Sequence, residues 1–94
     1  MLSSDQMDTI RSNLDHLETR YGVRITFEFI EELKSYRLYV RKDNAGCVRH
    51  FSYEELVFTR IGALETIHLS VLHMIDDVIK ATKIPDYYGM GENL

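Results

Sequence analysis

The stretch YRLYVRKDNAGCVRHFSYEEL, residues 36–56, decides the fold, because it holds a strand, a turn, a second strand and the start of a helix. Tyr36, Leu38 and Val40 alternate with Arg37, Tyr39 and Arg41, as in a strand that buries one face. The run from Asp43 to Gly46 favours a turn, since Asp and Asn side chains bond nearby backbone and glycine tolerates positive φ. Ser52 and Glu55 have the spacing of a helix capping box. The stretch therefore predicts a β-hairpin that leads directly into a helix.

The residues before this stretch predict a helix and another strand. Ser3 and Gln6 fit a second capping box, and an apolar stripe with spacings of three and four residues runs from Met7 to Tyr21. Gly22 can supply the left-handed residue that ends a helix. Apolar residues then occupy alternate positions over residues 23–29, which indicates a strand with one apolar face.

The residues after it predict two further helices. A short helix follows Ser52, and a break or kink is expected near Gly62, since glycine weakens a helix by about 1 kcal/mol relative to alanine. A longer helix then runs from Ala63 to about Thr82. The order α-β-β-β-α-α predicts an α+β fold, in which a three-stranded antiparallel meander has helices packed on one face. One domain is expected over residues 1–84, with a flexible C-terminal tail at residues 85–94.

Composition narrows the class of protein. The 94 residues carry a net charge of −4, whereas a protein held on DNA mainly by phosphate contacts is usually more basic. The single cysteine cannot form an internal disulfide, so we expect a reducing, cytoplasmic location. No apolar run approaches the ~18 residues of a membrane span, and no membrane partner is expected. No phosphate loop, nucleophile elbow or zinc-protease motif is present, so we expect neither catalysis nor a cofactor.

A zinc site is the first candidate motif, because Cys47, His50, His68 and His73 could form a four-ligand set. Cys47 and His50 have odd spacing on a predicted strand and should point to opposite faces. His68 and His73 are five residues apart on a helix, about 140° from each other. We therefore expect no metal site, and read CVRH as the return strand of the hairpin.

A basic sheet face is the leading candidate site. The segment from Leu33 to Tyr53 has a local charge of +4, which leaves −8 for the rest of the chain. A three-residue loop, residues 44–46, would pair Arg41 with Arg49. In that register one face of the sheet carries five candidate binding residues: Arg37, Tyr39, Arg41, Arg49 and Phe51. Such a face can bind anions, stack bases or dock an acidic protein. The plain alternative is an exposed face on which cross-strand pairs stabilise the sheet.

The like-charge pair of Arg41 and Arg49 ranks this face first, because it costs stability unless an anion or a carboxylate lies between the two side chains. A shift of the register by one residue would turn the third strand over and separate them. The sequence leaves open which face the third strand presents.

A second candidate surface is a self-association interface. Leu69, Leu72 and Met74 lie outside the main apolar stripe of the long helix, and leftover apolar helix surface commonly marks such an interface. Tyr87 and Tyr88 in the tail are residue types enriched at interfaces. The alternatives are helices that pack only on each other and a tail folded over its own core. We expect a homodimer.

The order α-β-β-β-α resembles that of double-stranded-RNA-binding domains in outline. That family carries a lysine-rich start to its last helix, whereas residues 63–67, ALETI, are acidic and apolar here, so the resemblance does not carry the function over. We therefore expect a small non-catalytic protein, of a size common among accessory and viral proteins, that docks on another protein and modulates it as a homodimer. The alternative is an anion, nucleotide or single-stranded nucleic-acid binder that uses the arginine-aromatic face.

Overall fold

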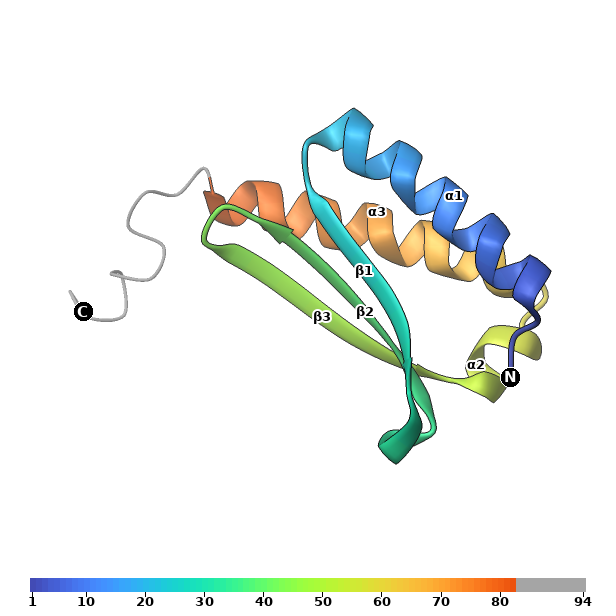
Figure 1. The fold of residues 1–94 in the computed structure, drawn as a ribbon. Helices are drawn as coiled ribbons and strands as arrows, with labels where there is room; N and C mark the ends of the chain where they lie inside the picture. The colour runs from blue at the N-terminus through green and yellow to red at the C-terminus, as the bar shows by residue number, and fades with distance from the viewer. Residues whose placement is uncertain (83–94) are drawn as a thin grey trace.

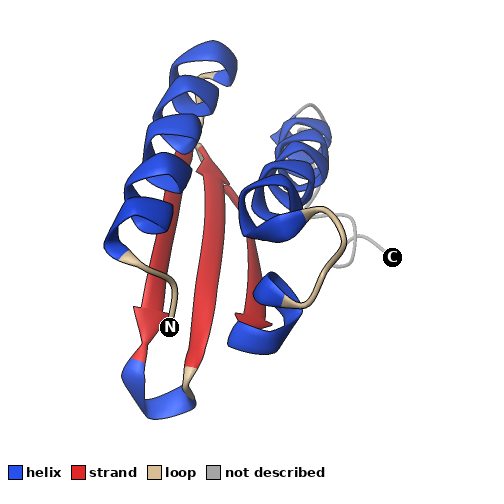
Figure 2. Cartoon of the chain, turned by 90° about the vertical axis from the view of Figure 1, so that its right-hand side faces the viewer, coloured by secondary structure: helices blue, strands red, loops and turns tan. Residues whose placement is uncertain are grey.

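The computed structural model describes residues 1–82 of the chain. In chain order the elements are α1 (Ser4–Tyr21), β1 (Arg24–Ile30), the 3-10 turn η1 (Glu31–Leu33), β2 (Ser35–Lys42), β3 (Ala45–Ser52), α2 (Tyr53–Val57) and α3 (Gly62–Thr82). The strands form one antiparallel sheet in the order β1-β2-β3, and the helices lie on one face of it (Figure 1, Figure 2). The predicted α+β fold and its element order are confirmed. The predicted tail, residues 85–94, lies outside the described residues.

Local signals set the helix ends as predicted. The Ser3 hydroxyl accepts from the Gln6 N–H at 3.1 Å, and the Gln6 side chain accepts from the Ser3 N–H at 2.8 Å. Ser52 and Glu55 form the same reciprocal pair at the start of α2. Gly22 ends α1 with a φ of 64°, in the left-handed region that suits glycine. Each cap satisfies backbone groups that the helix itself cannot pair.

The break between α2 and α3 is also confirmed. Gly62 has a φ of 82°, which a residue with a side chain rarely adopts. Its N–H donates to the Thr59 hydroxyl at 2.9 Å, and its carbonyl oxygen accepts from the Thr66 hydroxyl at 2.8 Å. Two threonines therefore satisfy the backbone at the point where the chain turns into α3.

None of the helices in residues 1–82 combines the length and the apolar character that a membrane span requires.

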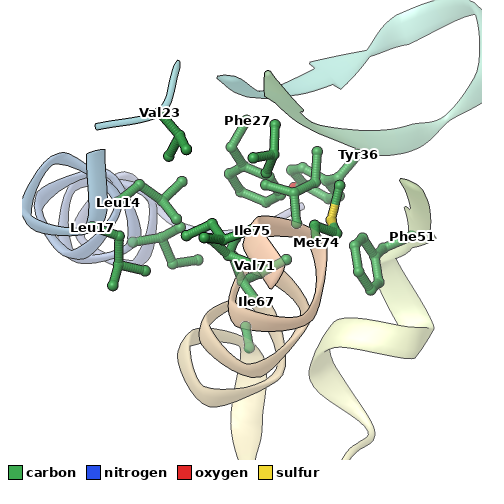
Figure 3. Packing of buried hydrophobic residues seen from close by; sticks show 14 of the residues in the cluster. Leu14, Leu17, Val23, Phe27, Tyr36, Phe51, Ile67, Val71, Met74 and Ile75 are labelled. Carbon is green, nitrogen blue, oxygen red and sulfur yellow. The ribbon is translucent and has the colours of Figure 1, made fainter. Parts of the chain in front are cut away.

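The core lies between the sheet and the helices α1 and α3 (Figure 3). At its centre Tyr36 is buried, stacked on the Phe27 ring at 5.4 Å between centroids and tilted against Phe29 at 5.0 Å. The Tyr36 hydroxyl accepts from the backbone N–H of Leu2 at 2.8 Å. The sheet centre thereby holds the first residues of the chain against the core.

The register of the β2–β3 hairpin differs from the predicted one. Lys42 pairs with Ala45, so the connection is the two residues Asp43 and Asn44. Asp43 takes a positive φ of 53°, the role that the prediction gave to Gly46. The pairing is shifted by three residues, and an odd shift turns the whole strand over. The predicted register was therefore wrong.

The physical reason lies in the core. In the observed register Phe51 lies opposite Tyr36 and is buried. Burying such a side chain stabilises the fold by roughly 1.5–3 kcal/mol relative to leaving it in water. The predicted register would have turned Phe51 to the solvent side. Local turn chemistry permits either loop, and the buried aromatic decides between them.

Candidate functional site

One face of the sheet faces away from all the helices of the described residues (Figure 2). Strand pairing and the alternation of exposure place nine residues on it, which we call the open sheet face: Arg24, Thr26, Glu28, Arg37, Tyr39, Arg41, Gly46, Val48 and His50. They form three cross-strand rows, one residue from each strand. Three arginines and one glutamate make this face basic, whereas the whole chain is acidic.

The strongest positive charge on the open sheet face comes from Arg24 and Arg41. The two residues are direct partners across β1 and β2, and both are exposed. Arg41 Nε donates weakly to the Asp43 carbonyl oxygen at 3.4 Å. Within residues 1–82, no carboxylate oxygen lies within ion-pair distance of either guanidinium. Like charges directly opposite each other destabilise a sheet, so this pair has a cost that an anion would remove.

The positive charge of Arg37, the other arginine of β2, is neutralised by a carboxylate. Arg37 forms an ion pair with Glu28, its direct partner on β1. Both side chains are well exposed, so the pair adds little to stability. It does leave the positive charge of the open sheet face concentrated at Arg24 and Arg41.

Tyr39 lies at the centre of the open sheet face. Its hydroxyl and ring lie beside Gly46, where a Cβ atom would come within 2.9 Å of the hydroxyl oxygen and 3.3 Å of the ring edge. The missing side chain of Gly46 therefore makes room for the tyrosine. Tyr39 is 36% exposed, so one side of its ring remains available to a partner.

Two shallow depressions flank Tyr39. One has a volume of about 460 Å³ and is lined by Thr26, Glu28, Arg37, Tyr39 and Val48. The other, of about 290 Å³, lies beside Arg41 and the β2–β3 turn. Val48 is 52% exposed in the first depression. Shallow, open hollows of this kind suit side chains of a docked macromolecule better than an enclosed small molecule.

Two of the predicted binding residues lie on the other face of the sheet. Arg49 and Phe51 turn toward the helices, where the Arg49 guanidinium lies over the Phe51 ring at 5.0 Å. Arg41 is therefore not opposite Arg49, and the predicted like-charge pair was wrong. Arg41 instead faces Arg24, which sequence reasoning missed. The alternation along β1 marked Arg24, Thr26 and Glu28 as a polar face, but the β1–β2 register was not predicted.

The four side chains considered as zinc ligands do not come together in the structure. Cys47 lies on the helix side of β3 and His50 on the open sheet face, as their odd spacing predicted. His68 Nδ1 accepts from the Asn13 side-chain amide at 2.9 Å, which links α3 to α1, and His73 is exposed. Among residues 1–82, no three metal-ligating side chains lie close enough to hold an ion.

Cys47 has the properties of a structural thiol. Partial burial raises its pKa, the negative charge of Asp77 on α3 raises it further, and Arg49 partly opposes this. The raised pKa keeps the thiol protonated at neutral pH, where a thiol is a poor nucleophile.

The predicted interface residues have different environments. Leu69 is 43% exposed on α3, Leu72 is half-buried, and Met74 is only 4% exposed because it packs in the core (Figure 3). Met74 is therefore not presented to a second copy. Tyr87 and Tyr88 lie outside the described residues.

Comparisons with known proteins identify no relative. The chain matches no protein-family model, no curated protein and no solved structure at a significant level.

Proposed function

We propose that this protein is a small non-catalytic docking protein that works as a homodimer. It binds an acidic segment of another protein on the open sheet face and thereby modulates that partner. The observation that carries the proposal is the uncompensated pair of Arg24 and Arg41 beside the exposed ring of Tyr39. The proposed setting is the cytoplasm, and the proposed activity uses no cofactor.

The chemistry of the pair supports an acidic partner. A carboxylate between Arg24 and Arg41 would cancel their repulsion and accept charge-assisted hydrogen bonds, which are about twice as strong as neutral ones. Arginine is also the residue best suited to hold carboxylates in two-pronged contacts. Tyr39 adds an aromatic surface of the kind enriched at protein interfaces. A peptide with spaced Asp or Glu residues satisfies all three groups.

The alternative partner is a single-stranded nucleic acid or a nucleotide, and the arginines next to an exposed tyrosine are the observation that favours it. One feature favours the acidic protein. Tyr39 is the only Phe, Tyr or Trp side chain on the open sheet face, whereas proteins that bind single strands stack successive bases on several aromatic rings.

The test compares two variants that change the net charge equally. In the first, Arg24→Glu with Arg41→Glu removes the proposed site. In the control, Arg11→Glu with Arg60→Glu reverses two exposed arginines outside the sheet. Fluorescence anisotropy measures binding of a short Glu-rich peptide and of a single-stranded oligonucleotide of similar length.

We expect the wild type and the control to bind the peptide, and the first variant to lose about tenfold or more in affinity. The affinity should fall as salt rises. Tighter binding of the oligonucleotide, lost in the same variant, would favour the alternative. A wild type that binds neither probe, or a control as impaired as the first variant, would refute both.

A further inference from the structure

The two edges of the sheet differ in what hydrogen-bonds to their backbone. The strand order leaves β1 and β3 as the edges. On β1, Glu18 of α1 accepts from the outward N–H of Ile25 at 2.7 Å, so this edge is partly occupied by the protein itself. On β3, no side chain or loop of residues 1–82 hydrogen-bonds to the backbone of Gly46, Val48 or His50. Unpaired strand edges are templates for another strand.

The direction of these backbone groups follows from the Ile25 contact. Since Ile25 turns its N–H away from β2, alternate residues of β1 do the same, and the residues between them bond β2. Ile25 lies opposite Val40, so Val40 directs its backbone groups toward β3, where its partner is Cys47. Cys47 and Arg49 therefore bond to β2. Gly46, Val48 and His50 then point their N–H and carbonyl groups at the free edge.

We infer that two copies join along the free edges of β3, with Val48 opposite Val48, so that the dimer has one continuous six-stranded sheet. This inference rests on the homodimer of the proposed function and specifies its interface. In this antiparallel register Gly46 lies opposite His50 of the second copy. Gly46, Val48 and His50 then each lie in a hydrogen-bonded pair, as an antiparallel ladder requires. The half-exposed Val48 side chain is covered by its counterpart.

Charge complementarity supports a second copy as the occupant. On the helix side of this register Arg49 lies opposite Cys47 of the second copy. Besides partial burial, the negative charge of the exposed Asp77 on α3 raises the pKa of Cys47 in its own chain, and Arg49 of that chain, which lies over Phe51, opposes it more weakly. Each Arg49 therefore faces net negative charge beside Cys47 of the other copy. An inward-pointing charge on an edge strand disfavours unselective pairing, and in this register the charge has a partner.

The arrangement also bears on docking. A two-fold axis perpendicular to the sheet relates the two β3 strands, so both open sheet faces lie on the same side and the helices on the other. The two basic faces then form one surface, with an Arg24–Arg41 pair toward each end. A partner with two acidic segments can engage both pairs at once, which raises its overall affinity.

The experiment uses the self-pairing of position 48. Val48→Lys and Val48→Glu each place like charges opposite each other across the axis, and an equimolar mixture places opposite charges there. Sedimentation equilibrium is expected to show a dimer for the wild type, monomers for each variant alone, and a restored dimer for the mixture. The matched controls are Thr26→Lys and Thr26→Glu, on the same sheet face but on β1, which are expected to stay dimeric. Circular dichroism verifies that every variant is folded.

A cysteine variant gives a second reading of the register. Residues 47 and 49 of different copies form a non-hydrogen-bonded pair, with Cα atoms about 4.5 Å apart, within reach of a disulfide. Arg49→Cys should therefore form a covalent dimer on mild oxidation. The wild type should not, because its Cys47 faces Arg49 rather than the other Cys47. Arg37→Cys, on the central strand, is the control and should stay uncrosslinked.

Three outcomes overturn the inference: a wild type that is monomeric at high micromolar concentration, Val48 variants that remain dimeric, or a mixture that fails to restore the dimer. The Arg24→Glu, Arg41→Glu variant separates this inference from the docking proposal, since it should lose the acidic peptide and remain a dimer. A monomer that binds the peptide refutes the β3 interface and the homodimer, but leaves the docking site on the open sheet face in place. A dimer that binds no peptide refutes the docking proposal alone.

Discussion

The two faces of β2 show how one strand serves stability and recognition at once. On the inner face Tyr36, Leu38 and Val40 are at most 1% exposed, whereas Arg37, Tyr39 and Arg41, which alternate with them, are exposed. The backbone is the same, and successive side chains simply point to opposite sides. The inner residues determine whether the chain folds, and the outer residues are free to determine what it binds.

The largest effect is expected at Leu38, which has no exposed surface. Leu38→Ala leaves a cavity between the sheet and the helices and should destabilise the fold by about 2–5 kcal/mol. Arg37→Ala, the adjacent residue on the outer face, removes one exposed ion pair and should change stability by less than about 1 kcal/mol. Urea unfolding of both variants measures the difference. Equal losses would show that the outer face also supports the fold.

The second-largest effect on stability is expected from removal of the Tyr36 hydroxyl. Tyr36→Phe keeps the ring stacking but leaves the buried N–H of Leu2 without its acceptor, at a cost of about 1–3 kcal/mol. Tyr39→Phe makes the same chemical change on the outer face and should alter stability by less than about 0.5 kcal/mol. Thermal unfolding monitored by circular dichroism compares the two. An unchanged midpoint for Tyr36→Phe would mean that water replaces the lost acceptor.

A smaller coupling is expected between Gly46 and Tyr39. Gly46→Ala places a methyl group within 2.9 Å of the Tyr39 hydroxyl, although alanine also reduces the entropy lost on folding. The substitution should therefore be more favourable by about 0.5–1 kcal/mol when Tyr39 is also changed to alanine. A double-mutant cycle isolates this coupling. A coupling of zero would show that the tyrosine ring moves aside freely.

A small gain in stability is expected from Arg41→Gln. Relieving the repulsion from Arg24 should stabilise the fold by about 0.2–1 kcal/mol, and the gain should fade as salt rises. The same variant should bind acidic peptide more weakly, because one of the two guanidinium groups is lost. A loss of stability at low salt would contradict the repulsion and weaken the case for an anion at this pair.

The smallest effect concerns Cys47 at the border of the inner face. Its pKa is raised by burial and by Asp77, so the folded state keeps the thiol proton longer than the unfolded state. Stability should therefore be unaffected at neutral pH and fall slightly as pH rises through the pKa of the unfolded thiol, at about 8.5. Alkylation rates across pH report the thiol directly. Asp77→Asn should lower the apparent pKa of Cys47, and an unchanged rate profile would contradict the proximity of Asp77.

Parts of the candidate site were predictable and parts were not. The outward placement of Arg37, Tyr39 and Arg41 follows from alternation along one strand, and the structure agrees with it. The third-strand residues were misassigned, since the face of β3 depends on pairing with β2. Predicting the Arg24–Arg41 pair would have required the β1–β2 register. That register depends on the length and shape of the turn η1 between the two strands.

The sequence by itself determined the helix ends and the strand periodicities, because caps such as Ser3 with Gln6, and the alternation along β2, depend on residues within a few positions of one another. Only the tertiary structure decided which face of β3 looks outward. The residues around Asn44 permit a two-residue or a three-residue turn, and burial of Phe51 against Tyr36 selects between them. That choice is non-local, because it depends on a core that exists only once the helices and the sheet have packed together.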